Sequence, residues 1–397
     1  MSEHPKAPLS GLKVIESSLL GPAAITTPFV DMGAEVIKVE APAGDYIREM
    51  TWPIIEGTSL MHYHLNRGKK SITLDLRSEE GKEVYRDLVK GADVVVEAMR
   101  PGALARLGLG FEDLKAINPK IIYGLITGFG TSGPYAEKSG FDVVAQGMGG
   151  IMSITGEPEG EPMKVGVAIV DVTSALYLAI GILAALHHRE KTGEGQMIDV
   201  ALLDSQVSWL VNVASSYLVS GNRPKRYGNQ HATIVPYQVF KVKDGYLIVG
   251  VGSEKQWKDF CRMLHREEWA EDPRFHINKE RVKNREILIP MIQEEMMLKT
   301  REEWLALMEK YAVPGGPINE VDEVFADPQV LHREMLVKMP HPTAGEVKLV
   351  GSPIKLSETP VSYKMAPPLL GQHTEEILKE LGYSQNEIKA FQDKNIV

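Results

Sequence analysis

Short apolar runs alternate with helix-forming segments through the first half of the chain. A strand candidate at 12–16 is followed by a helix candidate at 22–32 and a second strand candidate at 34–40, which is the pattern of a strand–helix–strand unit. Further strand candidates lie at 71–76, 93–97, 121–126 and 197–201. Repeated alternation of this kind predicts a parallel sheet with helices on both faces, that is, a doubly wound α/β domain.

The longest apolar pattern of the chain meets a carboxylate at its start. The apolar run 165–170 leads into Asp171, and a helix candidate continues from there to Glu190. Asp is a favoured N-cap residue, so one interpretation of Asp171 is purely structural. Asp can also attack a carbonyl carbon to form an acyl-enzyme intermediate. Because an ionised carboxylate at the end of a buried segment is costly, a catalytic role would explain its presence there. The residues alone leave both interpretations open.

The composition changes at 220–226, which predicts a linker out of the first domain. Beyond it, the segment 237–250 has the pattern of a hairpin with a tight turn at Asp244-Gly245, and a helix-rich segment follows at 256–311. We therefore predict a second, smaller α+β domain.

Composition and charge narrow the class of protein. The 397 residues are enough for two domains, and a formal net charge of −9 argues against a nucleic-acid binder, because the phosphate backbone rewards clustered positive charge. The apolar stretch 175–186 is shorter than the roughly 20 residues of a membrane span, so no span is predicted. The N-terminus lacks the apolar core of a signal peptide and Cys261 is the only cysteine, so we expect a cytoplasmic protein.

Several chemistries lack their motifs. The turn at 17–22 does not match the Gly-x-Gly-x-x-Gly of dinucleotide sites, and no Gly-x-Ser-x-Gly nucleophile elbow occurs. His187 and His188 are adjacent, so they project differently from a helix and do not form a metal-binding pair. No metal site is predicted.

Cations gather near the predicted carboxyl ends of the strands, where doubly wound sheets bind their ligands. They are Arg67, Lys69, Lys70, Arg77, Arg100 and Arg106, with Lys138 further on. Each alone is an ordinary solvated charge, but their recurrence beside predicted loops of an acidic protein favours an anion site. His231, in a loop of small residues where the second domain begins, is a further candidate because such loops commonly line clefts.

Several motifs together resemble the class III CoA-transferases, the CaiB/BaiF family. They lie at 9–14, 33–40, 44–48, 69–72, 100–110, 128–135, 154–158 and 369–373. The resemblance extends from about Leu9 to about Ile388, which is nearly the whole chain.

The resemblance implies a fold and a set of site residues. A Rossmann-like large domain would consist of residues 1–220 and 329–397, with a smaller α+β domain inserted at 221–328, and two subunits would interlock as a homodimer. The catalytic aspartate would be Asp171. The CoA-contacting positions would be Ser18, Leu19, Leu74, Arg77, Ala98, Met99, Arg100 and Arg106. CoA would enter as an acyl-CoA substrate, and no tightly bound cofactor is expected.

The segment 231–240 is similar to the succinyl-CoA:glutarate branch of the family, which handles dicarboxylates. The resemblance therefore implies transfer of CoA from a donor such as succinyl-CoA to an acceptor such as glutarate, through an aspartyl anhydride and an aspartyl-CoA thioester. Arg48, Lys138 and His231 are the candidates for binding the distal carboxylate of the acceptor.

This chain departs from the family pattern in places. It has Ala41 and Ala98 where many members carry a cation and an Asn, so some CoA contacts must differ. The 2-methylacyl-CoA racemases of the same fold use a histidine just before an aspartate, where this chain reads Phe141-Asp142, and Phe cannot carry a proton. A racemase, a thioesterase and a catalytically silent CoA-binding protein stay as alternatives.

Overall fold

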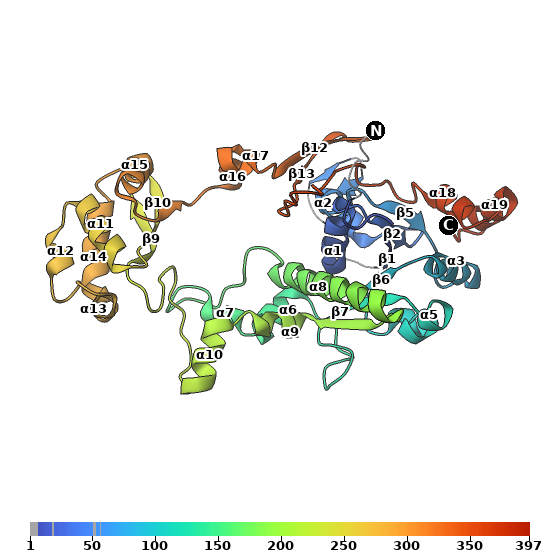
Figure 1. Cartoon of the computed structure of the whole chain (residues 1–397), viewed down its shortest axis with the longest axis horizontal. Helices are drawn as coiled ribbons and strands as arrows, with labels where there is room; N and C mark the ends of the chain where they lie inside the picture. Colours follow the sequence, from blue (N-terminus) through green and yellow to red (C-terminus); the bar gives the residue numbers. More distant parts are fainter. Residues whose placement is uncertain (1–6, 18–19, 51–52, 56) are drawn as a thin grey trace. The chain divides into compact units, whose positions relative to one another are not determined.

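The computed structural model describes residues 7–17, 20–50, 53–55 and 57–397 (Figure 1). The contacts divide the chain into two compact units. Unit 1 consists of Met1–Ile151, Val165–Ser215 and Pro328–Val397, and unit 2 of Met152–Lys164 and Ser216–Asp327. Residues 152–164, which the sequence analysis assigned to the large domain, thus group with unit 2. The expected domain boundaries stay a prediction.

A six-stranded sheet in the order β5-β2-β1-β6-β7-β8 forms the centre of unit 1. The strands are β1 (Lys13–Ser17), β2 (Glu35–Glu40), β5 (Lys70–Thr73), β6 (Val94–Glu97), β7 (Ile122–Thr127) and β8 (Met197–Ala201). All neighbouring strands are parallel, so the predicted parallel α/β sheet is confirmed. From β1 the chain first adds β2 and β5 on one side of the sheet and then β6, β7 and β8 on the other side. The direction in which strands are added therefore reverses between β1 and β6.

Alternate residues of these strands enter two separate cores, as the two-residue period of a strand requires. On one face, Val14, Val96 and Ile122 pack with α1 (Leu20–Asp31) and α8 (Ile169–Thr192). Helices α1 and α8 contact each other there.

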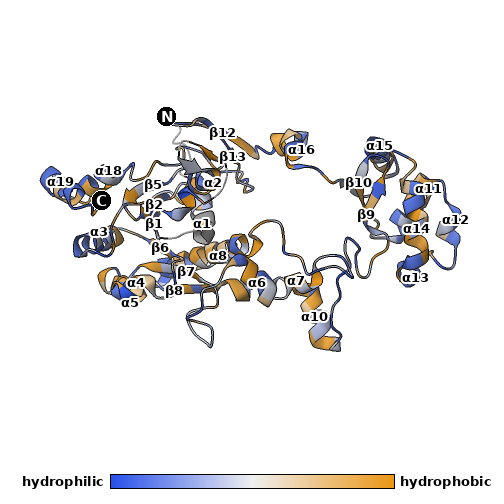
Figure 2. Ribbon diagram, turned by 180° about the vertical axis from the view of Figure 1, so that it is seen from behind, coloured by the Kyte–Doolittle hydropathy of each residue, from blue (hydrophilic) through white to orange (hydrophobic). Residues whose placement is uncertain are grey.

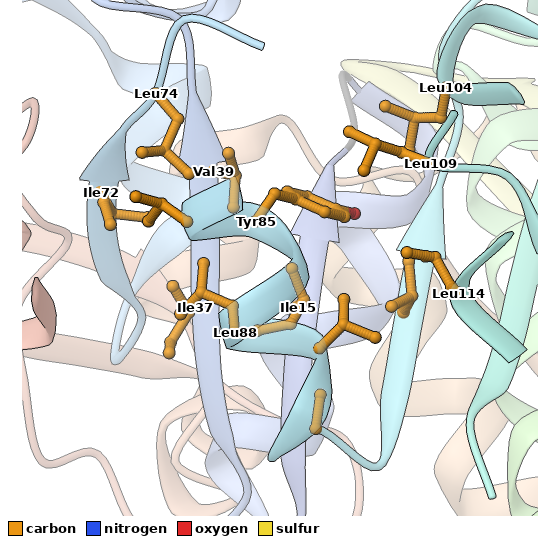
Figure 3. Close-up of a cluster of buried hydrophobic side chains, with 14 of the residues drawn as sticks. Ile15, Ile37, Val39, Ile72, Leu74, Tyr85, Leu88, Leu104, Leu109 and Leu114 are labelled. Carbon is orange, nitrogen blue, oxygen red and sulfur yellow. The ribbon is translucent and has the colours of Figure 1, made fainter. Parts of the chain in front are cut away.

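On the opposite face, Ile15, Val95 and Tyr123 pack with α3 (Glu79–Lys90) and α5 (Phe111–Ile117), a cluster drawn in part in Figure 3. Two C-terminal helices, α18 (Thr374–Glu380) and α19 (Gln385–Asp393), complete this second face, and Figure 1 shows them beside α3. Lys70 of β5 pairs with Glu376 of α18 at 2.8 Å.

Shorter elements connect and flank these layers. In unit 1 they include η1 (Tyr46–Arg48), β3 (Ile54–Ile55), β4 (Thr58–Ser59), α2 (Leu60–Asn66), α4 (Ala103–Arg106), α6 (Asp142–Met148), α9 (Leu202–Ser208), α17 (Pro328–His332), β12 (Leu336–His341) and β13 (Gly345–Val350). Two helices extend past a unit boundary, namely α7 (Ile151–Ile154) and α10 (Val211–Ser220).

Unit 2 has an antiparallel sheet in the order β11-β10-β9. Its elements are β9 (Tyr237–Val242), β10 (Gly245–Gly250), α11 (Glu254–Leu264), α12 (Glu268–Glu271), α13 (Asn278–Lys283), α14 (Arg285–Met296), α15 (Arg301–Tyr311), β11 (Gly315–Pro317) and α16 (Val321–Ala326). The predicted hairpin is present, but Val242 pairs with Gly245, so the turn residues are Lys243 and Asp244. Cys261 is buried in the core of the unit, and burial raises the pKa of its thiol to about 12.

Helix α8 is more apolar than the sequence analysis anticipated. By length and composition it could cross a membrane, with a mean hydropathy of 2.1 over an 18-residue window that is 39% buried. The sequence analysis counted only residues 175–186, whereas the helix begins at Ile169 and the additional first turns lengthen its apolar stretch. Core helices pass the same test, and Leu178 and Ile182 of α8 lie fully buried against the sheet.

The C-terminal helices should contribute directly to the stability of unit 1. Leu378 of α18 is fully buried in the second core, so Leu378→Ala should lower the free energy of unfolding by about 2 to 5 kcal/mol through lost packing and a cavity. Chemical denaturation monitored by circular dichroism measures the change. The neighbouring Lys379→Ala alters only an exposed side chain and should stay within about 0.5 kcal/mol of wild type. Equal losses in both variants would contradict a core role for α18.

Candidate active site

The first turn of α8 is capped from outside the helix. The N-cap residue is Ala168 and Asp171 is the third helical residue, so the interpretation of Asp171 as the N-cap is wrong. The capping oxygen comes from Asp142 at the start of α6, whose carboxylate accepts a hydrogen bond from the Val170 amide at 2.8 Å. The other oxygen of Asp142 accepts from the side-chain amide of Gln146 at 2.6 Å. Asp171 is thereby spared from capping.

The surroundings of Asp171 raise the basicity of its carboxylate. Burial, together with the negative charge of Asp142, raises the pKa of Asp171 to about 6. Within the described residues no ion pair or hydrogen bond holds this carboxylate. A carboxylate that is more basic than usual and free of partners is a better nucleophile than an ordinary surface aspartate.

Tyr46 is a site residue that the sequence analysis missed. Its phenol has a raised pKa because of burial and the negative charges of Asp45 and Asp171, so it stays neutral near the carboxylate of Asp171. The turn that carries it is anchored on both sides: Asp45 accepts the Ile47 amide at 3.1 Å and pairs with Lys38 at 3.0 Å. Tyr46 itself is 49% exposed. The motif Gly44-Asp45 pointed to this segment, but nothing in it singled out a tyrosine.

Arg48, a candidate for the acceptor carboxylate, is occupied by another partner. Its Nε and Nη2 atoms donate to the two oxygens of Glu40 at 2.7 and 2.8 Å, and the residue is buried. The remaining nitrogen of the guanidinium, Nη1, donates to the Pro368 carbonyl at 3.4 Å. A role for Arg48 in substrate binding stays a prediction.

Three cations of the proposed anion cluster are structural instead. Lys69 is fully buried and pairs with Glu16 at 2.7 Å, and Glu16 also pairs with Lys38 at 3.1 Å. Arg67 is buried and pairs with Asp31 at 2.6 Å, while Lys70 binds Glu376. These three cations neutralise carboxylates within the fold. Arg67, Lys69 and Lys70 therefore do not belong to an exposed anion site.

The other CoA-binding candidates lie along one edge of the parallel sheet. Arg77 follows β5, is exposed, and donates from Nε to Asp75 at 2.8 Å. Ala98, Met99 and Arg100 follow β6, with the first two half-buried and the arginine exposed. Arg106 is the last residue of α4. Because all strands of the sheet are parallel, the carboxyl ends of β5 and β6 lie on the same side of the sheet, although β2 and β1 separate the two strands. This is the side on which such sheets bind ligands.

The remaining candidates are placed less favourably or cannot be placed. Leu74 is buried in the second core, which leaves only its backbone for a ligand. Ser18 and Leu19 lie outside the described residues. Lys138 is exposed on a loop, and its ammonium group lies 4.1 Å from the centre of the Tyr135 ring.

A cavity of about 310 Å³ opens beside Arg106. Its lining includes Glu97, Arg106, Phe111, Tyr123, Thr127 and Glu137. Aromatic walls with a few charged groups at the carboxyl edge of a doubly wound sheet are typical of a small-molecule site. The described residues contain no cluster of three or more His, Cys, Asp or Glu side chains that could hold a metal ion.

His231 lies in unit 2 on an anchored loop. Its amide donates to the Tyr237 carbonyl at 3.0 Å, and its Nδ1 accepts from the Thr233 amide at 3.2 Å. Because Nδ1 is an acceptor, the neutral ring carries its proton on Nε2. Arg285 holds the loop by donating to the carbonyl of Ala232 at 2.8 Å.

Comparison with known proteins decides the family. A sequence model of CoA-transferase family III matches residues 9–374. The chain belongs to this family. The resemblance found in the sequence is confirmed, and the protein is a class III CoA-transferase.

Individual relatives are similar along nearly their whole length. The succinyl-CoA:glutarate CoA-transferase of Homo sapiens is 42% identical over 94% of this chain and 86% of its own length. The succinate–glutarate CoA-transferase of Agrobacterium fabrum is 44% identical over 95% of this chain and 96% of its own length. A crystal structure of a CaiB/BaiF family protein from Brucella suis superimposes with a TM-score of 0.86 at 44% identity, over 95% of this chain and all of the other.

The charge of Asp142 should control the pH dependence of this CoA-transferase. Asp142→Asn keeps an oxygen for the Val170 amide but removes the negative charge that helps to raise the pKa of Asp171 above its ordinary value. The predicted role of Asp171 as nucleophile requires an ionised carboxylate, so wild-type activity should fall as the pH drops through about 6. In the variant this acid limb should move to lower pH, as measured by the pH profile of kcat for CoA transfer.

Asp199→Asn is the matched control, because Asp199 caps the loop at Thr131 in the same unit and does not act on Asp171. Its acid limb should coincide with that of wild type. An unshifted limb in Asp142→Asn would show that the two carboxylates are not electrostatically coupled.

Proposed function

We propose that this protein moves CoA from a donor such as succinyl-CoA to a dicarboxylate acceptor such as glutarate, with Asp171 as the nucleophile. The observation that carries the proposal is the carboxylate of Asp171, which is raised in pKa, unpartnered within the described residues and released from capping by Asp142. The names of the human and Agrobacterium relatives support the dicarboxylate pair.

The reaction keeps the energy of the thioester in every intermediate. Asp171 attacks the thioester carbonyl of the donor, giving a mixed anhydride and CoA thiolate. The thiolate attacks the aspartyl carbonyl, which releases the donor acid and leaves an aspartyl-CoA thioester. The acceptor carboxylate then attacks the aspartyl carbonyl, which forms a second anhydride and frees the thiolate. Attack of the thiolate on the acceptor's acyl carbon gives the new acyl-CoA and regenerates Asp171.

The surroundings of Asp171 suit these steps. Asp171 is half-buried, which limits the access of water that would hydrolyse the anhydride. The N-terminal turn of α8 places backbone N–H groups and the positive end of the helix dipole near the oxyanions that form at Asp171. The neutral phenol of Tyr46 adds a hydrogen-bond donor on the solvent side.

Binding of the substrates is assigned to the edge of the parallel sheet. Arg77 and Arg106 would bind phosphates of CoA, and Ser18, Leu19, Leu74 and the segment 98–100 would contact the rest of the molecule. CoA is a substrate here, so no tightly bound cofactor is required. Lys138 and His231 are the remaining candidates for acceptor contacts, because neither ammonium nor Nε2 has a hydrogen-bond acceptor among the described residues, whereas Arg48 donates to both oxygens of Glu40. With Ala41 and Ala98 in this chain, some of the CoA contacts would be made differently from those of many family members.

The domain organisation and the homodimer also belong to this proposal. Residues 1–220 and 329–397 would form the large domain and residues 221–328 the small one, which is supported by the grouping of Pro328–Val397 with the N-terminal segments. Leu176 and Ile180 on the outer face of α8 are 56% and 63% exposed, and Figure 2 shows apolar residues along this helix. A second copy that covers this face, as in an interlocked dimer, would remove it from water.

The alternatives have less support. Phe141 is exposed beside the Asp142 cap and has no proton to exchange, which leaves a racemase without one of its acid–base groups. The net charge of −9 disfavours nucleic acid as a partner. We place the protein in the cytoplasm, with α8 as a core helix that does not enter a membrane.

Purified protein incubated with succinyl-CoA and a panel of acids should form a new acyl-CoA and free succinate in equal amounts. The panel is glutarate, adipate, mesaconate, itaconate, oxalate, carnitine and benzylsuccinate, and mass spectrometry identifies the product. We expect glutaryl-CoA among the products. Free CoA alone would indicate a thioesterase, and intact succinyl-CoA with every acid would refute the proposed donor.

Asp171→Ala tests the nucleophile in the same assay. Transfer should fall to background because no anhydride can form, while CoA binding measured by calorimetry should persist. Retained transfer in Asp171→Ala would sink the mechanism, and loss of both transfer and binding would point to misfolding, which circular dichroism would reveal.

The apolar face of α8 predicts the oligomeric state. Wild type should elute as a dimer in size-exclusion chromatography with light scattering, and Ile180→Glu should shift it towards monomer because a charge would be buried at the interface. Lys90→Glu on the exposed end of α3 is the control and should remain dimeric. A monomeric wild type would contradict the dimer.

A further inference from the structure

The loop that carries His231 contains neither helix nor strand, yet it is held along its whole length. We call residues 230–235 the His231 loop. Its anchors are three polar side chains, Asn278, Arg281 and Arg285, which come from α13 and the start of α14. Binding residues on loops work best when a rigid scaffold positions them, and these three side chains connect the loop to such a scaffold.

Arg285 binds the first part of the His231 loop. Its Nη2 donates to the carbonyl oxygens of His231 at 3.3 Å and Ala232 at 2.8 Å, and its Nη1 donates to the side-chain oxygen of Gln230 at 3.2 Å. The remaining nitrogen, Nε, donates to the Val282 carbonyl at 3.4 Å. Every nitrogen of this guanidinium thus has an acceptor within unit 2, so Arg285 holds the loop and is not available as an anion-binding group.

Asn278 and Arg281 hold the other end of the His231 loop. Asn278 accepts the Val235 amide at 3.0 Å and donates to the Thr233 carbonyl at 2.8 Å, while Nε of Arg281 donates to the Val235 carbonyl at 2.6 Å. The carboxylate of Glu254, in α11, accepts the Asn278 amide at 2.8 Å and Nη1 of Arg281 at 2.7 Å. Arg281 and Val235 are buried, so a shift of the loop would leave buried polar groups without partners.

The loop also fixes the ring of His231. The Thr233 amide donates to Nδ1 at 3.2 Å, and the ring packs edge-on against Tyr237 with 5.3 Å between the ring centres. Because Nδ1 receives an N–H, the proton of the neutral ring lies on Nε2, and a second proton on Nδ1 would face the Thr233 amide. The Nε2–H group has no acceptor among the residues that the structure describes, which leaves it as a donor for a ligand.

A single N–H donor in a fixed orientation suits one oxygen of a carboxylate. The ordering of the donor is achieved when unit 2 folds, so a ligand does not have to immobilise it on binding. A hydrogen bond to an ionised acceptor is also stronger than one between neutral groups.

We propose that Asn278, Arg281 and Arg285 are positioning residues that present the Nε2–H of a neutral His231 to the distal carboxylate of a dicarboxylate acceptor. They thereby set affinity for the acceptor without touching it. This inference rests on the proposed function, in which His231 is an acceptor contact.

Arg285→Ala tests the proposal through a split between kinetic constants. The KM for glutarate, or for the dicarboxylate that wild type uses, should rise about tenfold, which corresponds to one hydrogen bond to a charged group. The kcat at saturating acceptor should be retained, and CoA binding measured by calorimetry should equal that of wild type, because the proposed CoA contacts lie in unit 1. An unchanged KM, or a loss confined to kcat, would overturn the proposal.

Lys283→Ala is the matched control. It removes a positive charge from α13, but Lys283 is exposed and its ion-pair partner is Glu280 at 4.0 Å, outside the His231 loop. Its KM for the acceptor should equal that of wild type. A rise as large as that of Arg285→Ala would show that lost charge, and not lost anchoring, weakens acceptor binding, which would refute the positioning role.

Variants of His231 test whether Arg285 acts through this ring. His231→Ala should raise the KM for the acceptor about tenfold, and adding Arg285→Ala should raise it no further. His231→Gln keeps a neutral N–H donor near the position of Nε2 and should restore most of the affinity. Full additivity would show that Arg285 contacts the acceptor itself, and equal losses in His231→Gln and His231→Ala would show that a neutral donor is not enough. Either result would overturn the proposal.

Arg285→Lys covers the case in which Arg285→Ala does not fold. Lysine keeps the charge but lacks the fork that holds residues 230–232 together, so the KM for the acceptor should lie between those of wild type and His231→Ala. A KM equal to that of wild type would refute the anchoring. If wild type transfers CoA to no dicarboxylate, the proposed function fails, whereas transfer with a wild-type KM in all Arg285 and His231 variants refutes only this inference.

Discussion

The hydrogen bond between the Val170 amide and Asp142 is the interaction on which the candidate active site depends. It satisfies the start of α8 from a neighbouring helix, and so the carboxylate within that first turn is left without a structural task. It also places a second negative charge near Asp171, which, with burial, raises the pKa of this carboxylate to about 6. One contact thus both leaves the carboxylate of Asp171 free of the capping role and contributes to its raised pKa.

A second set of interactions supports the turn that faces this carboxylate. Lys38 is buried between Glu16 and Asp45, and Arg48 is paired with Glu40, so charges of both signs alternate beneath η1. Buried pairs of this kind add little net stability but define one arrangement, because any other would leave a charge without a partner. Tyr46 is the exposed residue of this turn, and the network holds the backbone that carries it.

Periodicity in the sequence was enough to predict the parallel sheet, the hairpin of unit 2 and the long helix after Asp171, since each depends on local patterns. Contacts between distant residues could not be predicted in this way. Lys69 looks like an anion-binding cation until Glu16, 53 positions away in the chain, is seen beside it. Asp142 precedes Val170 by 28 positions, and no local pattern indicates that it caps α8. The family motifs predicted Asp171 as the catalytic residue, whereas its raised pKa and the neighbouring phenol required coordinates.

The second face of the parallel sheet has a consequence for biosynthesis. Helices α18 and α19 cover strands that are translated long before them, and the whole of unit 2 is made in between. During translation, the apolar side chains of β1, β2 and β5 on this face are therefore made before the helices that complete their core. The three strands of the unit 2 sheet, in contrast, all lie within the continuous segment Ser216–Asp327. Until α18 and α19 are made, helices such as α3 and α5 cover this face of the sheet only in part, and apolar strand surface left uncovered invites aggregation.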